Sequence, residues 1–379
     1  MSLITLKGIT WGHSRGITPL MAYSQRFTEK YPDVEITWRK RTLQEFADYP
    51  IERLVDHYDL LIIDHPWVGC ADATRCVLPL DEYLSKEYLK EQWDHQVGRS
   101  HQSYYYGGHQ WALATDAAAP VASYRKDLLS ENDLPKTWED LLDLARKGKV
   151  AAPAIPIDLL MNFYTFCLAH GVEPFLSKEE VIDQETGVKA LETMRDFYAL
   201  LDKSMFERNP IKVAEVMSNS DDYWYCPFAY GYVNYTREGY APNVLHYTGL
   251  VSFDGSPLRS TVGGTGLAIS AGCEHKEWAV KFAEEIVSPE IQSTFYTEYG
   301  GQPGHRKAWE RDLNNVLTNN YFRNTIDTLD NSYMRPRYNH YLHFQDHAGD
   351  PVQAYLRDGG NPKVALEAMN KIYRESLSR

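Results

Sequence analysis

Short apolar runs alternate with amphipathic segments along the N-terminal part of the chain. Residues 4–10 predict a strand, and Pro19 then marks the first position of a helix. Residues 34–38 alternate between apolar and polar positions as a strand does, and residues 60–63 (LLII) predict a strand buried on both faces. With a further helix around residues 42–55, the order strand, helix, strand, helix, strand predicts an α/β lobe on a largely parallel sheet.

The remainder of the chain continues this mixture of strands and helices. A Gly-Gly turn opens a strand that ends at Asp116, and Thr137 begins a helix with Asp140 in the capping-box position. Residues 157–220 are predicted to be mainly helical, and the glycine-rich stretch GGTG at 263–266 leads into another strand. The fold class predicted for the whole chain is therefore α/β.

Length, charge and cysteine content limit the kind of protein this is. With 379 residues the chain exceeds the roughly 250–300 at which one core stops growing, so two lobes are expected. A net charge of −13, from 52 acidic and 39 basic side chains without a basic block, argues against nucleic acid as a partner. Five cysteines describe neither a disulfide framework nor a zinc site, although Cys70 and Cys76 could close a small loop. No apolar run reaches the roughly 18 residues of a membrane span.

Two loops carry aromatic and charged side chains directly after predicted strands. Ligands of open α/β sheets bind at the carboxyl ends of the strands, so these loops form half of a binding site if their strands are adjacent. The two histidines and the aspartate among them are metal-ligand types, but a hydrogen-bonding role is favoured. The loop residues are Trp11, His13 and Arg15 after the first strand, and Asp64, His65 and Trp67 after the strand at 60–63.

The motifs of several common enzyme classes are missing from the sequence. There is no G-x-S-x-G elbow, no H-E-x-x-H helix and no complete G-x-G-x-x-G turn, and GGTG lacks the Lys-Ser/Thr of a phosphate loop. These absences argue against the corresponding hydrolases, metalloproteases and dinucleotide enzymes. We assign no catalytic residue, no metal and no cofactor, and our interpretation is a protein other than an enzyme.

Five segments between residue 8 and about residue 310 carry a shared pattern. They are FTEKYPDVEIT, YDLLIIDHPWVG, ASYRKDLL with LPKTWEDLLDLA, CPFAYGYVNY, and the long stretch from GGTGLAISAGCEHKEW to TEYGGQPGHRKAW. In this order they resemble the extracellular solute-binding proteins of ATP-driven importers, in particular the sugar-binding family 1 that includes maltose-binding protein. The resemblance implies a two-lobed, periplasmic-binding-protein-like fold of type II, with a ligand cleft between the lobes.

The same resemblance implies a division of the chain. The chain is expected to cross between the lobes near residue 115 and again at residues 263–266. Lobe one would hold residues 1–114 and about 266–310, and lobe two would hold residues 116–262 and about 311–379.

The family pattern also implies which residues contact the solute. Aromatic faces stack on the C–H patches of sugars, while carboxylates and arginine donate or accept charge-assisted hydrogen bonds with hydroxyls. The loops are richer in charge and imidazole than a neutral glycan needs, so an anionic solute such as a sugar acid is the alternative ligand. The expected contacts are Trp11, His13, Arg15, Asp64, His65, Trp67, Asp116, Phe228, Tyr230, Gly264 and Thr265.

The resemblance implies a monomeric protein that captures a small polar solute and presents it to the membrane permease of an ABC-type importer. Its expected location is periplasmic or extracellular, with membrane association if the chain is lipidated. The first residues show no basic stretch followed by an apolar region, so a cytoplasmic location stays open. Two alternatives accompany this reading: a cytoplasmic ligand sensor, and an enzyme on the same scaffold that uses Asp64, Asp116 or a cysteine.

Overall fold

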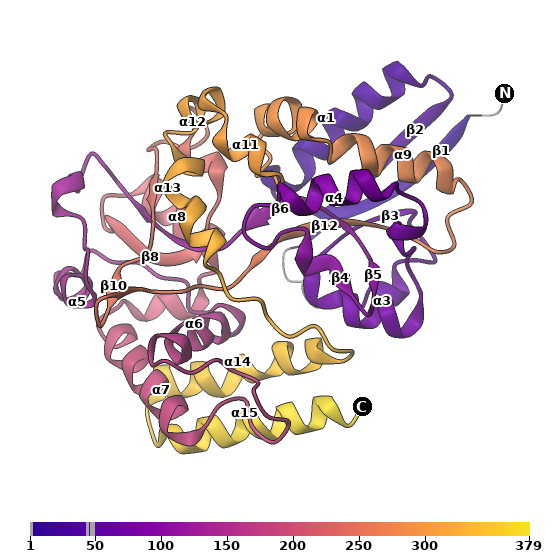
Figure 1. The fold of residues 1–379 in the computed structure, drawn as a ribbon. Coiled ribbons are helices and arrows are strands. Elements are labelled where there is room, and N and C mark those ends of the chain that lie inside the picture. The colour runs from indigo at the N-terminus through magenta and orange to yellow at the C-terminus, as the bar shows by residue number, and fades with distance from the viewer. Residues whose placement is uncertain (1–2, 43–44, 46–49) are drawn as a thin grey trace. The chain divides into compact units, whose positions relative to one another are not determined.

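The computed structural model describes residues 3–42, 45 and 50–379, and the chain divides into two compact units (Figure 1). The helix expected around residues 42–55 lies partly outside the described residues. Within it, a 3-10 turn is described at Ile51–Arg53. The first unit holds Met1–Ala118, Val262–Ile326 and Arg337–Asn339, and the second holds Ala119–Thr261, Asp327–Pro336 and His340–Arg379.

The first unit is built on a sheet of five described strands in the order β2-β1-β3-β12-β6. β1 pairs in parallel with β2 and β3, whereas β12 runs antiparallel to β3 and β6. The sheet is therefore mixed. The three strands expected in the N-terminal stretch pair in parallel as predicted, β12 runs against both of its neighbours, and β3 is buried at all four positions. The bounds are β1 Ile4–Trp11, β2 Val34–Arg41, β3 Leu60–Ile63, β6 Leu113–Ala118 and β12 Gly263–Ile269.

Aromatic side chains join the helices of this unit. Phe27 of α1 packs edge-on against Trp278 and Phe282 of α9, with ring centroids 6.3 and 5.3 Å apart. Such edge-to-face contacts add to the burial of apolar area. The other short strands of the unit are β4 Tyr105–Tyr106 and β5 His109–Gln110. The helices are α1 Ser14–Lys30, α3 Val68–Thr74, α4 Lys86–Asp94, α9 Lys276–Ile286, α10 Pro289–Ile291, α11 Arg306–Glu310, α12 Asp312–Leu317 and α13 Tyr321–Asp330, whose last residues belong to the second unit.

Helix α1 begins earlier than the sequence predicted. It starts at Ser14 because His13 caps it: the imidazole Nδ1 accepts the backbone N–H of Arg15 at 3.0 Å. Pro19 therefore lies inside the helix, where its missing N–H costs one backbone hydrogen bond. The prediction of a start at Pro19 was wrong because histidine is not among the usual N-cap residues.

The second unit combines a small antiparallel sheet, in the order β8-β7-β9, with a group of long helices. Helix α14 packs against α6 and α15, and Figure 1 shows α14 and α15 side by side. The predicted capping box of Thr137 and Asp140 at the start of α5 is confirmed. The bounds are β7 Pro120–Tyr124, β8 Tyr225–Tyr230, β9 His246–Thr248, β10 Ser252–Phe253, β11 Ser256–Pro257, α5 Trp138–Arg146, α6 Pro156–Ala169, α7 Gln184–Tyr198, α8 Pro210–Asn219, α14 Tyr341–Asp358 and α15 Pro362–Leu377.

The end of the first unit differs from the division that the sequence implied. Residues 311–326 belong to the first unit, whereas we expected the chain from about 311 onward to lie in the second. The reason is local packing: the side-chain amide of Asn314 donates to the carbonyl oxygens of Ser293 and Ala308 at 3.0 and 2.8 Å. The chain first leaves the first unit after Ala118 and first returns to it at Val262.

A short segment near the end of the chain completes the first unit. Residues Arg337–Asn339 lie so close to α3 that a Cβ on Gly69 would sit 2.0 Å from the carbonyl oxygen of Arg337. Nη1 of Arg337 donates to the carbonyl oxygens of Gln102, Ser103 and Tyr105 at 3.1, 3.0 and 2.8 Å. Glycine is needed at position 69 because the two backbones touch there.

Candidate functional site

The loop after β1 gathers an indole, an imidazole and a guanidinium. The rings of Trp11 and His13 are stacked, with centroids 5.6 Å apart and planes 14° from parallel, and the Arg15 guanidinium lies 5.5 Å from the Trp11 ring centroid. A Cβ on Gly16 would lie 2.3 Å from Nε1 of Trp11, so glycine makes room for the indole on α1. Burial, followed by the nearby Arg15, lowers the pKa of His13 to about 3, so its ring is neutral and its Nδ1 acts as the acceptor that caps α1.

Arg15 and Asp116, which stand 101 residues apart in sequence, form a buried ion pair. Nε of Arg15 donates to Oδ2 of Asp116 at 2.8 Å, and Nη2 donates to Oδ1 in a second short contact. Only 3% of Arg15 and 2% of Asp116 is exposed. Burial raises the pKa of Asp116, and the guanidinium opposes that rise. Arg15 and Asp116, which we expected to contact a solute, thus form an ion pair with each other.

β6 and β12, the strands at the two expected crossings, are neighbours in the sheet. Thr265 of β12 stands opposite Asp116 of β6, and its Oγ1 lies 3.2 Å from Oγ1 of Thr115. Gly264 has a φ of +109°, and a Cβ there would lie 2.3 Å from the carbonyl oxygen of Asp116. Only glycine accommodates both that backbone angle and that close approach. Gly264 therefore shapes the backbone that carries Asp116.

The loop after β3 is a short 3-10 turn, His65–Trp67, capped by Asp64. Oδ1 of Asp64 accepts the backbone N–H of His65 at 2.8 Å and lies 3.2 Å from its Nδ1. His65 is fully buried, and 5% of Trp67 is exposed. The indole N–H of Trp67 is buried and has no hydrogen-bond partner within the described part of the chain. A buried N–H of this kind lowers the stability of the fold unless another group accepts a hydrogen bond from it.

The two predicted site residues of the second unit differ in burial. Phe228 is 1% exposed and packs against Phe166 and Phe197, with ring centroids 6.0 and 5.4 Å apart. The structure therefore places Phe228 in the hydrophobic core. Tyr230, two residues later, is half-buried, and its hydroxyl lies 2.9 Å from Oγ1 of Thr261. Its position at the end of β8 leaves it the better candidate of the two.

The adjacency on which the site prediction rested is confirmed: β1 and β3 are paired, so both loops lie at the same edge of the sheet. Two residues at this edge were not predicted. Nη2 of Arg41, at the end of β2, donates to the carbonyl oxygen of Ile62 at 2.9 Å, and the Tyr104 hydroxyl donates to that of Ile63 at 3.2 Å. A basic residue ending an alternating strand was an available signal for Arg41. Tyr104 stands in a run of three tyrosines at 104–106, but its place beside β3 depends on a hairpin remote from β3 in sequence.

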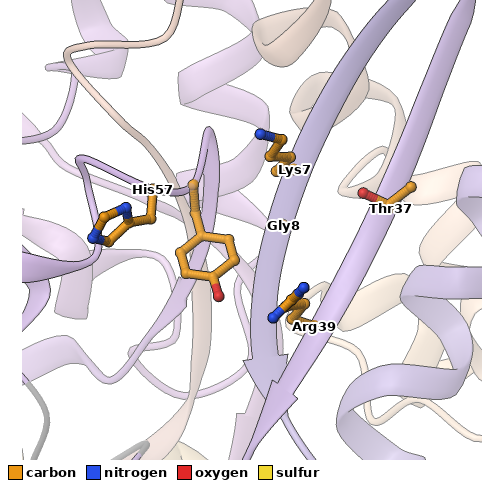
Figure 2. A pocket seen from close by; sticks show the side chains of 6 residues that line it. Lys7, Gly8, Thr37, Arg39 and His57 are labelled. Atoms are coloured by element: carbon orange, nitrogen blue, oxygen red, sulfur yellow. The ribbon is translucent and has the colours of Figure 1, made fainter.

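A pocket of about 440 Å³ lies elsewhere in the first unit, and Figure 2 shows the side chains that surround it. None of the predicted site residues lines it. The side chains come from β1, β2 and the segment before β3, away from the loops that follow β1 and β3. The lining residues are Lys7, Gly8, Thr37, Arg39, His57 and Tyr58.

Comparison with known proteins decides the family. The sequence profile described as "Bacterial extracellular solute-binding protein" matches residues 13–293, well over half of the chain. The chain belongs to this family. Its members are binding proteins, and the resemblance noted in the sequence is confirmed.

One relative and two solved structures are similar to this solute-binding protein. The maltotriose-binding protein of Pyrococcus abyssi is 28% identical over 127 residues, which are 32% of this chain and 27% of that protein. Maltose-bound MalE3 of T. maritima has a TM-score of 0.84 at 18% identity and covers 98% of this chain and 99% of its own. A ribitol-bound solute-binding protein of Agrobacterium radiobacter has a TM-score of 0.79 at 19% identity and covers 99% of both chains. These likenesses confirm the predicted two-lobed α/β fold class.

Within the described residues of this solute-binding protein, we find no helix that has both the length and the apolar character to span a bilayer.

Proposed function

We propose that this chain is a non-catalytic solute-binding protein that captures a neutral carbohydrate or polyol and delivers it to an ABC-type importer outside the cytoplasm. We place solute contacts on the loops after β1 and β3 of the first unit, at Trp11, His13, Asp64, His65 and Trp67. The prediction that Tyr230 of the second unit contributes a further contact goes with this proposal. The proposal also includes the prediction that the two units correspond to the two lobes of the family.

The buried Arg15–Asp116 pair is the observation that carries the choice of solute. Because the guanidinium is held by the carboxylate in a two-point contact, the pair has no net charge to offer an anion. His13, kept neutral by burial, adds none. A polyhydroxyl solute needs aromatic rings and polar donors rather than net charge. Trp11 and Trp67 supply the rings, and the indole N–H of Trp67 supplies a donor. A neutral sugar is therefore favoured over a sugar acid.

The solutes of the relatives support the same class of solute. The two solved structures contain maltose and ribitol, and the Pyrococcus abyssi protein is named for maltotriose. None of these solutes carries a charge.

The arrangement of the two candidate carboxylates argues against catalysis. Asp116 is engaged by Arg15, and Asp64 is used as the cap of the 3-10 turn. General acid–base catalysis needs a carboxyl group poised to exchange a proton with the substrate, and neither is arranged for that. The alternative of an enzyme that uses Asp64 or Asp116 is therefore not supported.

The test is a thermal-shift screen with maltose, maltotriose, ribitol, sugar acids, amino acids and divalent metals, followed by calorimetry on each hit. A solute present at about 100 times its dissociation constant stabilises the folded chain by about 2.7 kcal/mol, which is readily measured. We expect neutral sugars or polyols to shift the melting temperature and to be recovered chemically intact after incubation at stoichiometric concentration. Binding of sugar acids alone, or turnover of the solute, would contradict the proposal.

The contribution of the first unit is tested by Trp67→Phe, which keeps an aromatic ring and removes the buried indole N–H. Loss of one hydrogen bond, worth about 0.5–1.5 kcal/mol, predicts roughly 2- to 10-fold weaker affinity. The matched control is Trp138→Phe, because Trp138 is equally buried but lies in the core of the second unit. An equal loss of affinity in both variants would show that the effect of Trp67 is one of stability.

A further inference from the structure

The geometry points to a second site in the first unit: Glu91, His95 and His305 form a binding site for a divalent transition-metal ion such as Zn²⁺. One ligand atom from each residue can be chosen so that all three lie within 4.8 Å of one another. All three residues belong to the same unit, so the site does not depend on the second one. It shares no residue with the proposed solute site.

The backbone holds the three side chains together. Glu91 and His95 stand four residues apart at the end of α4, which places them on one helix face. His305, directly before α11, reaches them from a distant segment. The backbone N–H of Arg306 donates to the carbonyl oxygen of His95 at 2.6 Å, and that of Val97 donates to the carbonyl oxygen of Gly304 at 3.2 Å. These two bonds fix the segment against α4.

The donor atoms already point toward one another. Nε2 of His305 lies 3.0 and 3.2 Å from the two carboxylate oxygens of Glu91, and Nδ1 of His95 lies 3.2 Å from Oε1 of Glu91. The two imidazole rings are stacked, with centroids 5.6 Å apart. Bonds of about 2.0–2.2 Å to one Zn²⁺ bring tetrahedral ligand atoms to roughly 3.5 Å from one another, so small side-chain rotations suffice.

Burial differs among the ligands in a way that suits a metal site. The His305 side chain has no exposed surface, which fixes its ring, while 29% of Glu91 and 42% of the His95 side chain is exposed. An ion can therefore enter from solvent and keep water as a fourth ligand. Two imidazoles and one carboxylate favour Zn²⁺, Co²⁺ or Ni²⁺ over Mg²⁺ and Ca²⁺, which prefer oxygen ligands.

Nδ1 of His95, which lies 3.1 Å from the carbonyl oxygen of Glu91, gives up that contact when it binds the ion. Two further contacts must give way. Nζ of Lys307 lies 3.1 Å from Oε1 of Glu91, but this side chain is half exposed and can turn into solvent. Coordination through Nε2 of His305 places the ring proton on Nδ1, which gives up a 3.3 Å hydrogen bond from the backbone N–H of Lys307. Both are weak contacts compared with metal–ligand bonds.

The experiment measures Zn²⁺ and Co²⁺ binding to the full chain, freed of metal by a chelator and without a histidine tag, by calorimetry and by melting temperature. We expect one ion per chain, a dissociation constant in the micromolar range and a higher melting temperature when the ion is present. Removing one of three ligands by His95→Ala should weaken binding by at least about tenfold, and Glu91→Gln should weaken it as well. His95 is exposed enough for its variant to fold.

The matched control is His343→Ala. His343 and His347 form another histidine pair four residues apart on α14 of the second unit, with ring centroids 4.8 Å apart, but no carboxylate completes a three-residue group there among the described residues. Binding that survives in His343→Ala and is lost in His95→Ala supports the site. Binding that is lost in His343→Ala, or that is weaker than millimolar in the unaltered chain, would overturn it.

Discussion

The buried pair of Arg15 and Asp116 yields a prediction about the stability of the first unit. Arg15→Met keeps the length of the side chain but leaves the Asp116 carboxylate buried without its partner. Breaking a buried pair in this way costs about 3–5 kcal/mol, because the remaining charge keeps the full penalty of lost hydration. Both side chains are almost completely buried, so screening by solvent does not reduce the figure.

The double variant Arg15→Met with Asp116→Leu separates the ion pair from its packing. Replacing a buried pair by apolar groups of similar volume is often neutral or stabilising, so this variant should be more stable than Arg15→Met alone. The expected coupling between the two positions is about 3 kcal/mol or more.

Urea unfolding of the solute-free chain is the assay, followed by circular dichroism, with melting temperature as a second reading. For a folding unit of roughly 150–250 residues, each kcal/mol shifts the melting temperature by about 2–4 °C, so Arg15→Met should lower it by roughly 6–20 °C. The control is Arg323→Met, which removes an exposed pair with Asp312 in the same unit and should cost at most about 1 kcal/mol.

One result would refute this reasoning. If Arg15→Met and Asp116→Leu each leave the solute-free chain as stable as the unaltered one, yet abolish stabilisation by a solute, the two residues are ligand contacts. The proposed preference for neutral solutes would then lose its support.

Two further predictions concern buried titratable groups. Burial raises the pKa of Asp158, on α6, from 3.8 to about 8, so folding takes up a proton and stability should fall as the pH rises from about 4 to about 8, by up to roughly 1.4 kcal/mol per unit. Urea unfolding at pH 5 and pH 8 should show that Asp158→Asn removes this slope, and parallel slopes in both proteins would contradict the assignment. The neighbouring Cys70 thiol lowers the pKa of Cys76 to about 7, so iodoacetamide at pH 7.5 under reducing conditions should modify Cys76 first. Peptide mapping should find slower modification of Cys76 in Cys70→Ala. An unchanged rate would show that Cys70 does not affect the reactivity of Cys76.

Local patterns predicted the parts of this fold that depend on neighbouring residues. The four apolar residues of β3 indicated a strand buried on both faces, and Thr137 with Asp140 indicated the start of α5. Both follow from physics within a few residues: the period of the side chains and the capping of free N–H groups. The pairing of β1 with β3 was left open, because β2 lies between them in the chain and successive strands are the more usual neighbours.

The sequence could not predict interactions that depend on distant segments. Arg15 and Asp116 each looked like a solute contact, and nothing in the intervening residues shows that one neutralises the other. Phe228 lies in an aromatic stretch that favoured a cleft wall, whereas its packing against Phe166 and Phe197 depends on where α6 and α7 run. The candidate site was therefore predicted to the correct edge of the sheet, but not in its internal contacts.

The segment Arg337–Asn339, which packs against Gly69 and the carbonyl groups near Gln102, bears on how the chain is made. A ribosome that has translated only the N-terminal stretch has produced most of a sheet but lacks β12 and this last piece of backbone. The first unit can reach its final form only after nearly the whole message has been read. No contiguous fragment that ends before this segment should fold like the complete protein, and an early stop codon should leave an unfinished unit for proteases to remove.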